Sequence, residues 1–256
     1  MDLQQYLDFT TSLAYRAGRI TLGYFNTGVA AGLKRDNSPV TAADRAAEGF
    51  IRGEIERVFP GHGIMGEEYG EDRRDGSAFR WIIDPIDGTK SFMRGVPLYG
   101  VLVGLEIEGT IRVGAAYFPP LDEMLSAADG LGAWWNGRQA RVSAVDAVKD
   151  ACICYTSYHK FPARRPGVWE RLASAAYMLR GWSDAYGYLL VATGRAEGCL
   201  DPTMAVWDCG PFPVIFREAG GFFGSWSGAE GHKHGEALGC NAAIKDELLT
   251  LLRENI

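Results

Sequence analysis

A short segment in the first half of the chain joins an apolar run to two acidic side chains. Trp81-Ile82-Ile83 is followed by Asp84-Pro85-Ile86-Asp87-Gly88-Thr89. A strand that ends in this way must satisfy two charges at the edge of a core. Carboxylates and a freed backbone carbonyl are the hard oxygen ligands that Mg²⁺ prefers. If Gly88-Thr89 opens a helix, the first N–H groups of that helix suit a phosphate.

Each part of this segment also has a purely structural interpretation. Asp84 could end a strand, Asp87 could form a turn with Gly88, and Thr89 could be a helix N-cap. The apolar setting shifts the balance towards a site, because two charges at a core edge need partners.

Acidic residues in three other parts of the chain could join the same site. Glu67 and Glu68 end a second apolar strand; they point to opposite faces, and we expect Glu67 to face the site. Asp44 lies early in an expected helix, where the helix dipole favours an acid without any function. Asp208 precedes a Gly-Pro pair at an expected helix start, where it could be an N-cap. No single one of these acids indicates a site, but their joint occurrence in one chain does.

Composition limits the classes of partner. The chain has 256 residues, 26 basic and 32 acidic, with a net charge of −6 and no long run of either sign. We therefore expect no nucleic-acid partner. No apolar run approaches a membrane span and the N-terminus lacks the order of a signal peptide, so we expect neither membrane insertion nor secretion. Five cysteines without CxxC spacing indicate a reducing, cytoplasmic setting.

Hydrophobic spacing predicts a layered α/β protein. We expect one domain over 1–256 with two packed halves, about 1–145 and 146–256, the first built on a mostly antiparallel sheet and the second on another layered sheet. The expected helices are 3–25, a helix from Thr41 to Val58, 169–178, 185–193 and 211–219. The expected strands are 63–66, 79–83, 99–107, 111–117, 152–155 and 198–200, with an exposed turn region over 220–234 that holds the solvated His232 and His234.

Together these motifs resemble the inositol monophosphatase family of Mg²⁺-dependent, often Li⁺-sensitive phosphatases. The matching motifs are residues 34–44, Gly66-Glu67-Glu68, the segment 84–89 and Trp207-Asp208, which span nearly the whole chain. The resemblance implies the αβαβα five-layer sandwich of the sugar phosphatases, a small phosphorylated metabolite as substrate, two or three Mg²⁺ per site and a homodimer.

The resemblance also implies a role for each site residue. It implies a set of metal ligands: Glu67, Asp84, Asp87, Asp208 and the Ile86 carbonyl. The amides of Gly88 and Thr89 would hold phosphate. Thr89, Asp44 and Glu67 would be the catalytic residues, with Asp44 and Thr89 positioning the attacking water and Asp44 lying near a third, weaker metal. The loop 34–40 would close when metal binds.

Within the family, residues 88–97 and 183–196 are similar to the histidinol-phosphatase branch. By this resemblance Asp184 and Asp201 contact the substrate. Two acids facing the leaving group suit a cation, and histidinol phosphate has an ammonium group and a titratable imidazole. Helix capping by Asp184 and a turn at Asp201-Pro202 are the structural alternatives. We expect histidinol phosphate as substrate, ahead of inositol 1-phosphate or another sugar phosphate. A non-catalytic, metal-binding relative is the hypothesis from a different class.

Overall fold

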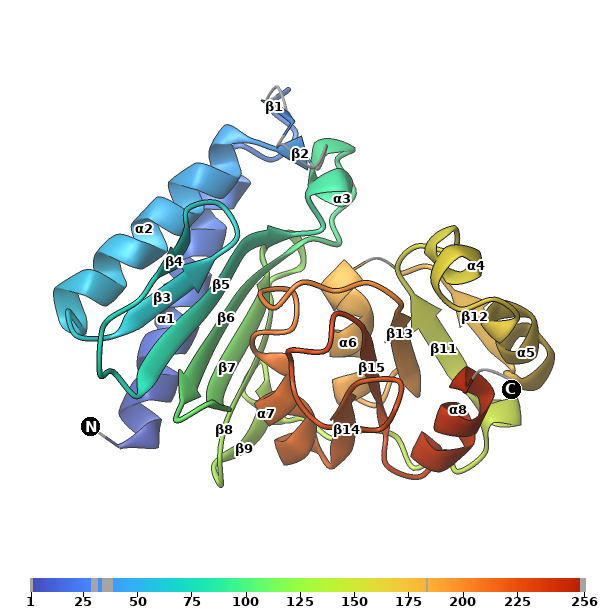
Figure 1. The fold of residues 1–256 in the computed structure, drawn as a ribbon. Helices are drawn as coiled ribbons and strands as arrows, with labels where there is room; N and C mark the ends of the chain where they lie inside the picture. The colour runs from blue at the N-terminus through green and yellow to red at the C-terminus, as the bar shows by residue number, and fades with distance from the viewer. Residues whose placement is uncertain (1, 29–31, 34–38, 183, 254–256) are drawn as a thin grey trace.

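Two large β-sheets and three layers of helices make up the body of the fold (Figure 1). The structure is a computed structural model that describes residues 2–28, 32–33, 39–182 and 184–253. The helices are α1 (Leu3–Leu22), α2 (Ala42–Val58), α3 (Thr89–Met93), α4 (Lys160–Arg164), α5 (Val168–Ala175), α6 (Asp184–Ala192), α7 (Phe212–Ala219) and α8 (Lys245–Leu252). Short 3₁₀ turns lie at Pro119–Leu121 and Val148–Asp150.

The larger sheet has eight strands in the order β10-β9-β8-β7-β6-β5-β3-β4. Its strands are β3 (Gly63–Gly66), β4 (Gly70–Asp72), β5 (Phe79–Asp87), β6 (Gly100–Ile107), β7 (Thr110–Phe118), β8 (Glu123–Ala128), β9 (Gly132–Trp135) and β10 (Arg138–Gln139). All neighbouring pairs are antiparallel except β3 and β5, which confirms the expected mostly antiparallel sheet.

The smaller sheet has five strands in the order β12-β11-β13-β15-β14. Its strands are β11 (Cys152–Tyr155), β12 (Met178–Arg180), β13 (Gly198–Asp201), β14 (Gly221–Gly224) and β15 (Ala237–Asn241). A separate two-stranded ladder joins β1 (Gly32–Leu33) to β2 (Pro39–Val40). The loop expected to close on metal lies largely outside the described residues, which omit 34–38.

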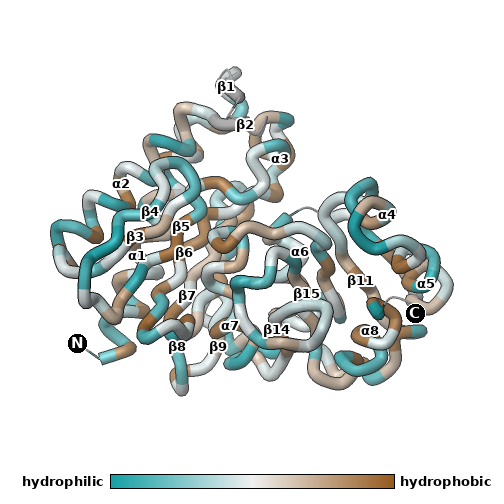
Figure 2. The backbone as a smooth tube through the Cα atoms, viewed as in Figure 1, coloured by the Kyte–Doolittle hydropathy of each residue, from teal (hydrophilic) through white to brown (hydrophobic). Residues whose placement is uncertain are grey.

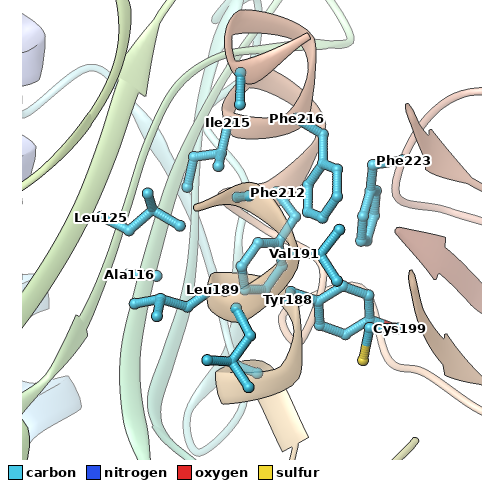
Figure 3. Packing of buried hydrophobic residues seen from close by; sticks show 14 of the residues in the cluster. Ala116, Leu125, Tyr188, Leu189, Val191, Cys199, Phe212, Ile215, Phe216 and Phe223 are labelled. Carbon is cyan, nitrogen blue, oxygen red and sulfur yellow. The ribbon is translucent and has the colours of Figure 1, made fainter. Parts of the chain in front are cut away.

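Helices cover both faces of each sheet, which gives the layer order α-β-α-β-α. Helices α1 and α2 pack on one face of the larger sheet, α6 and α7 fill the space between the sheets, and α5 and α8 cover the outer face of the smaller sheet (Figure 1). The middle layer is strongly aromatic: Tyr188, Phe212 and Phe216 pack together and against Phe223 of β14 in Figure 3. This layer confirms the five-layer sandwich.

Local sequence explains where the first helices begin. Asp2 and Gln5 form a capping box at α1, and Thr41 forms another with Asp44 at α2. Strand β6 and residues 81–83 of β5 are buried on both faces and are largely apolar, with brown stretches of the tube in Figure 2. Among the described residues, no helix is both long and apolar enough to cross a membrane.

Three expectations for the second half are wrong. The helix expected over 169–178 ends at Ala175, because the chain turns there into the edge strand β12. The segment expected as an exposed turn over 220–234 contains β14 and buries its aromatic side chains. His232, expected to be solvated, is buried, and its Nε2 lies 3.0 Å from Glu106 Oε2. The boundary between halves near residue 145 stays a prediction.

Candidate active site

Strand β5 presents both of its carboxylates on the same face of the sheet. In a regular strand, side chains three residues apart point to opposite faces. Here Asp84 pairs with Leu102 and Asp87 with Gly100, so β5 has one extra residue between them, a β-bulge. Pro85 lies within the bulge, where its missing N–H costs no ladder bond. Leu102 packs in the middle layer, and both carboxylates therefore face the space between the two sheets.

Asp208 reaches this point because two facing glycines of the larger sheet leave room for the backbone of the neighbouring segment 210–211. Gly104 and Gly114 lie opposite each other on β6 and β7. A Cβ on Gly104 would lie 2.4 Å from the Gly210 carbonyl oxygen, and a Cβ on Gly114 would lie 2.5 Å from that of Pro211. The backbone at 210–211 thus rests directly on the sheet, which holds Asp208 near β5.

Asp84, Asp87 and Asp208 form a compact carboxylate cluster. Each offers one oxygen atom, and these atoms all lie within 4.8 Å of one another. Glu67 borders this cluster, because it lies close enough to Asp84 for its carboxylate to raise the pKa of Asp84. The Glu67 backbone continues the β3–β5 pairing, since its N–H donates to the Ile83 carbonyl at 3.3 Å.

The pKa values of the cluster are all displaced in the direction that favours the protonated acid. Burial raises the pKa of Asp84 and that of Asp87 well above the ordinary value, and repulsion from neighbouring carboxylates adds to it. Burial raises the pKa of Asp208 to about 6. Such a group of acids is stabilised by a bound cation. Oxygen donors with this charge and spacing fit a divalent metal.

Asp44 lies at the edge of this group. Its Oδ2 accepts hydrogen bonds from the backbone N–H and hydroxyl of Thr41, at 2.7 and 2.6 Å. Its Oδ1 is buried and has no hydrogen-bond partner among the described residues. Burial raises the pKa of Asp44, with a contribution from Glu67. One carboxylate oxygen therefore caps the helix, and the other is available to a ligand or a water.

The residues that follow Asp87 turn sharply into α3. Gly88 adopts a φ of 83°, in the left-handed region that favours glycine, and its missing Cβ would lie 2.9 Å from Asp184 Oδ2. Gly88, not Thr89, is the N-cap of α3. The Thr89 hydroxyl donates to the Ile86 carbonyl at 3.1 Å, which closes the turn around Asp87 and Gly88.

A small cavity of about 60 Å³ opens beside the carboxylate cluster. Its lining includes Asp87, Asp208, Asp184 and Asp201. Asp201 ends β13 and is buried, with the Tyr188 hydroxyl donating to its Oδ2 at 2.9 Å. Burial raises the pKa of Asp201 to about 7. The structure thus brings both acids expected to contact substrate to one side of the cluster.

Three lining or supporting residues were not identified from the sequence. Thr156 and Lys160 line the same cavity, and Tyr188 orients Asp201. Thr156 directly follows β11, and Tyr188 lies four residues after Asp184 on α6, so strand-end position and helical spacing could have indicated both. Lys160 had no such signal, because it lies on the short helix α4 in a loop-rich segment.

Comparison with known proteins gives this site a family. The profile described as "Inositol monophosphatase family" matches residues 2–256. The chain belongs to the inositol monophosphatase family. It is therefore a phosphomonoesterase, in a family that is generally metal-dependent.

Individual relatives cover almost the whole chain. A histidinol-phosphatase of Chlorobaculum parvum is 42% identical over 236 residues, 91% of this chain and 90% of that protein. An inositol-1-monophosphatase of Mesorhizobium japonicum is 31% identical over 255 residues, 97% of this chain and 96% of that protein. The crystal structure of extragenic suppressor protein suhB from Bartonella henselae superposes with a TM-score of 0.91 at 28% identity, covering 98% of this chain and 100% of that one.

Proposed function

We propose that this phosphomonoesterase is Mg²⁺-dependent and hydrolyses histidinol phosphate to histidinol and phosphate. The observation that supports this choice of substrate is that Asp184 and Asp201 line the cavity beside the carboxylate cluster. A phosphate seated at the cluster would direct its leaving group into this cavity. Two acids there favour a leaving group with a positive charge, such as an ammonium or a protonated imidazole.

We assign the metal to Glu67, Asp84, Asp87, Asp208 and the Ile86 carbonyl, with two or three Mg²⁺ per site. The mutual distance of the three aspartate oxygens and their raised pKa values support this assignment. When bound, divalent cations neutralise phosphoryl oxygens and lower the pKa of a coordinated water. We assign the phosphate contact to the amides of Gly88 and Thr89, at the start of α3.

The remaining groups of the chain orient the reaction. The unpartnered Oδ1 of Asp44 is a buried acceptor that can hold the attacking water and receive its proton. The Thr89 hydroxyl, held by its bond to the Ile86 carbonyl, is the second group that we assign to the water. Asp184 and Asp201 bind the leaving group and position it in line with the phosphorus atom.

A substrate panel with Mg²⁺ tests the proposal. Specificity constants are compared for histidinol phosphate, inositol 1-phosphate, fructose 1,6-bisphosphate and adenosine 3′,5′-bisphosphate. We expect histidinol phosphate to be preferred. Preference for inositol 1-phosphate, or equal use of several sugar phosphates, would contradict the proposed substrate. It would favour the alternative that the protein is an inositol monophosphatase or a broad sugar-phosphate phosphatase. No hydrolysis of any member would favour a non-catalytic, metal-binding relative.

We further propose a homodimer in the cytoplasm. The described cysteines are free and buried, which supports a reducing compartment. The homodimer rests on resemblance to the family, and light scattering of the purified protein tests it, with a monomer mass as the contrary result.

A further inference from the structure

Glu48 is a fully buried carboxylate on α2, one helical turn after Asp44. Both of its oxygens accept hydrogen bonds from the turn that follows β3. Oε2 accepts from the Glu68 backbone N–H at 2.7 Å, and Oε1 accepts from that of Tyr69 at 3.2 Å. The same Oε1 also accepts from Arg52 Nε at 2.8 Å. Both oxygens of Glu48 are therefore engaged by this turn and by Arg52.

The turn is shaped to receive this carboxylate. A Cβ on Gly66 would lie 2.0 Å from Glu48 Oε1, so any larger residue at position 66 would displace the Glu48 side chain. Arg52 also donates to the Gly70 carbonyl, so the Glu48–Arg52 pair holds N–H and C=O groups of the same turn. A glycine is required here by close approach and not by a left-handed φ.

The backbone on each side of Glu67 is fixed by hydrogen bonds. On one side, its own N–H bonds the Ile83 carbonyl of β5. On the other side, the next two N–H groups bond Glu48. These bonds leave the Glu67 backbone little freedom, and they direct its side chain towards Asp84. A buried ion pair such as Glu48–Arg52 contributes little net stability, so placement of the turn is its more evident effect.

We propose that Glu48 is a positioning residue for the metal site: by holding the Glu68 and Tyr69 amides it aims Glu67 at the carboxylate cluster and so sets metal affinity. This inference rests on the proposed Mg²⁺-dependent function. It concerns a side chain that touches neither metal nor substrate and acts only through the backbone of its neighbours.

The test is Glu48→Gln, which keeps the shape but replaces one acceptor oxygen by an NH₂ group that faces an N–H donor. Glu56→Gln is the matched control, because it makes the same change on an exposed face of the same helix. Mg²⁺ binding to each full-length protein is measured by calorimetry without substrate, and amide hydrogen exchange at Glu68 and Tyr69 is measured without metal.

For Glu48→Gln we expect at least about tenfold weaker Mg²⁺ binding, the loss typical of changing a residue that orients a ligand. We also expect faster exchange at both amides, and a kcat that recovers towards the wild-type value at high Mg²⁺. A purely structural residue would lower the folded fraction without moving the Mg²⁺ dependence of the folded molecules. Unchanged Mg²⁺ affinity per folded molecule would overturn the inference. If the wild-type protein itself binds no Mg²⁺, the proposed function fails instead.

Gly66→Ala gives an independent test from the other side of the contact, and it applies even if Glu48→Gln folds poorly. Its methyl group should displace the Glu48 carboxylate and weaken Mg²⁺ binding by a similar factor. Because both changes break the same contact, the double variant should bind no more weakly than about the worse single variant. Wild-type Mg²⁺ affinity in Gly66→Ala, or fully multiplicative losses in the double variant, would contradict the inference.

Discussion

Asp87 on β5 accepts a hydrogen bond of 2.6 Å from the backbone N–H of Ala185, the second residue of α6. This bond joins the larger sheet to the middle helix layer, at the point where Asp208 and Asp184 also arrive. An acid at a helix N-terminus is favoured by the exposed N–H groups there. The bond therefore aligns Asp87 and the substrate side of the cavity with each other.

Replacing Asp84 by Asn should abolish metal binding and turnover while making the metal-free protein more stable. The loss should exceed the about 10–100-fold effect typical of residues that only orient a metal ligand. The gain in stability is expected because Asn removes a buried acid whose ionised form is repelled by Glu67 and Asp87. Calorimetry with Mg²⁺ and thermal unfolding in chelator at pH 8 measure the two effects. Retained Mg²⁺ affinity would remove Asp84 from the ligand set.

Stability of the metal-free protein should fall as pH rises from about 4 to about 7. The pKa of Asp201 is about 7 in the folded protein and 3.8 ordinarily, so between these values the folded state binds more protons than the unfolded state. The free energy of unfolding therefore decreases as pH rises, and over the full range Asp201 lowers it by on the order of 4 kcal/mol. Urea unfolding in chelator at several pH values measures it. Asp201→Asn should flatten the curve, whereas exposed Asp75→Asn should not; a curve that rises with pH in this range would contradict the prediction.

Mg²⁺ should stabilise the protein more at pH 8 than at pH 5, since metal and protons compete for the same carboxylates. At a concentration of about 100 times the dissociation constant, the gain at pH 8 should be about 2.7 kcal/mol. Thermal unfolding with and without Mg²⁺ at both pH values checks this. A pH-independent gain would indicate binding away from the raised-pKa acids.

Asp184→Ala should weaken hydrolysis of histidinol phosphate but spare that of a small aryl phosphate. The side chain lines the leaving-group cavity, and an aryl phosphate has no cation for it to bind. Specificity constants on both substrates are measured for wild type, for Asp184→Ala and for the control Asp146→Ala, which changes an exposed residue. Equal losses on both would place Asp184 in the metal or phosphate site instead.

Gly104→Ala should destabilise the protein and weaken metal binding together. Its methyl group would meet the Gly210 carbonyl, and pushing this backbone off the sheet moves nearby Asp208. Overpacking of this kind costs about 1–3 kcal/mol. The control is Gly49→Ala, which meets nothing within 4 Å on an exposed face of α2 and should be neutral or stabilising. Urea unfolding and Mg²⁺ titration measure both effects, and unchanged Mg²⁺ affinity in a destabilised Gly104→Ala would separate the packing contact from the site.

Local patterns determined much of this protein. Capping residues, apolar periodicity and turn residues identified α2 from its Thr41 cap, strands β3 and β11, and the β6–β7 hairpin, because each depends on neighbours in the chain. The same patterns failed at β12, which directly follows an apolar helix, and at β14, which lies in a segment rich in Gly and Ser; pairing with β11 and β15 makes these segments strands.

The acids of the site were visible in the sequence as residue types, but only the tertiary structure decided their arrangement. The bulge that turns Asp84 and Asp87 to one face, the glycine pair that admits residues 210–211, and the Glu48 contact that holds the turn after Glu67 all depend on close approach between distant segments. Such contacts leave no periodic trace in the chain, because they are fixed by how sheets and helices pack and not by local backbone preference.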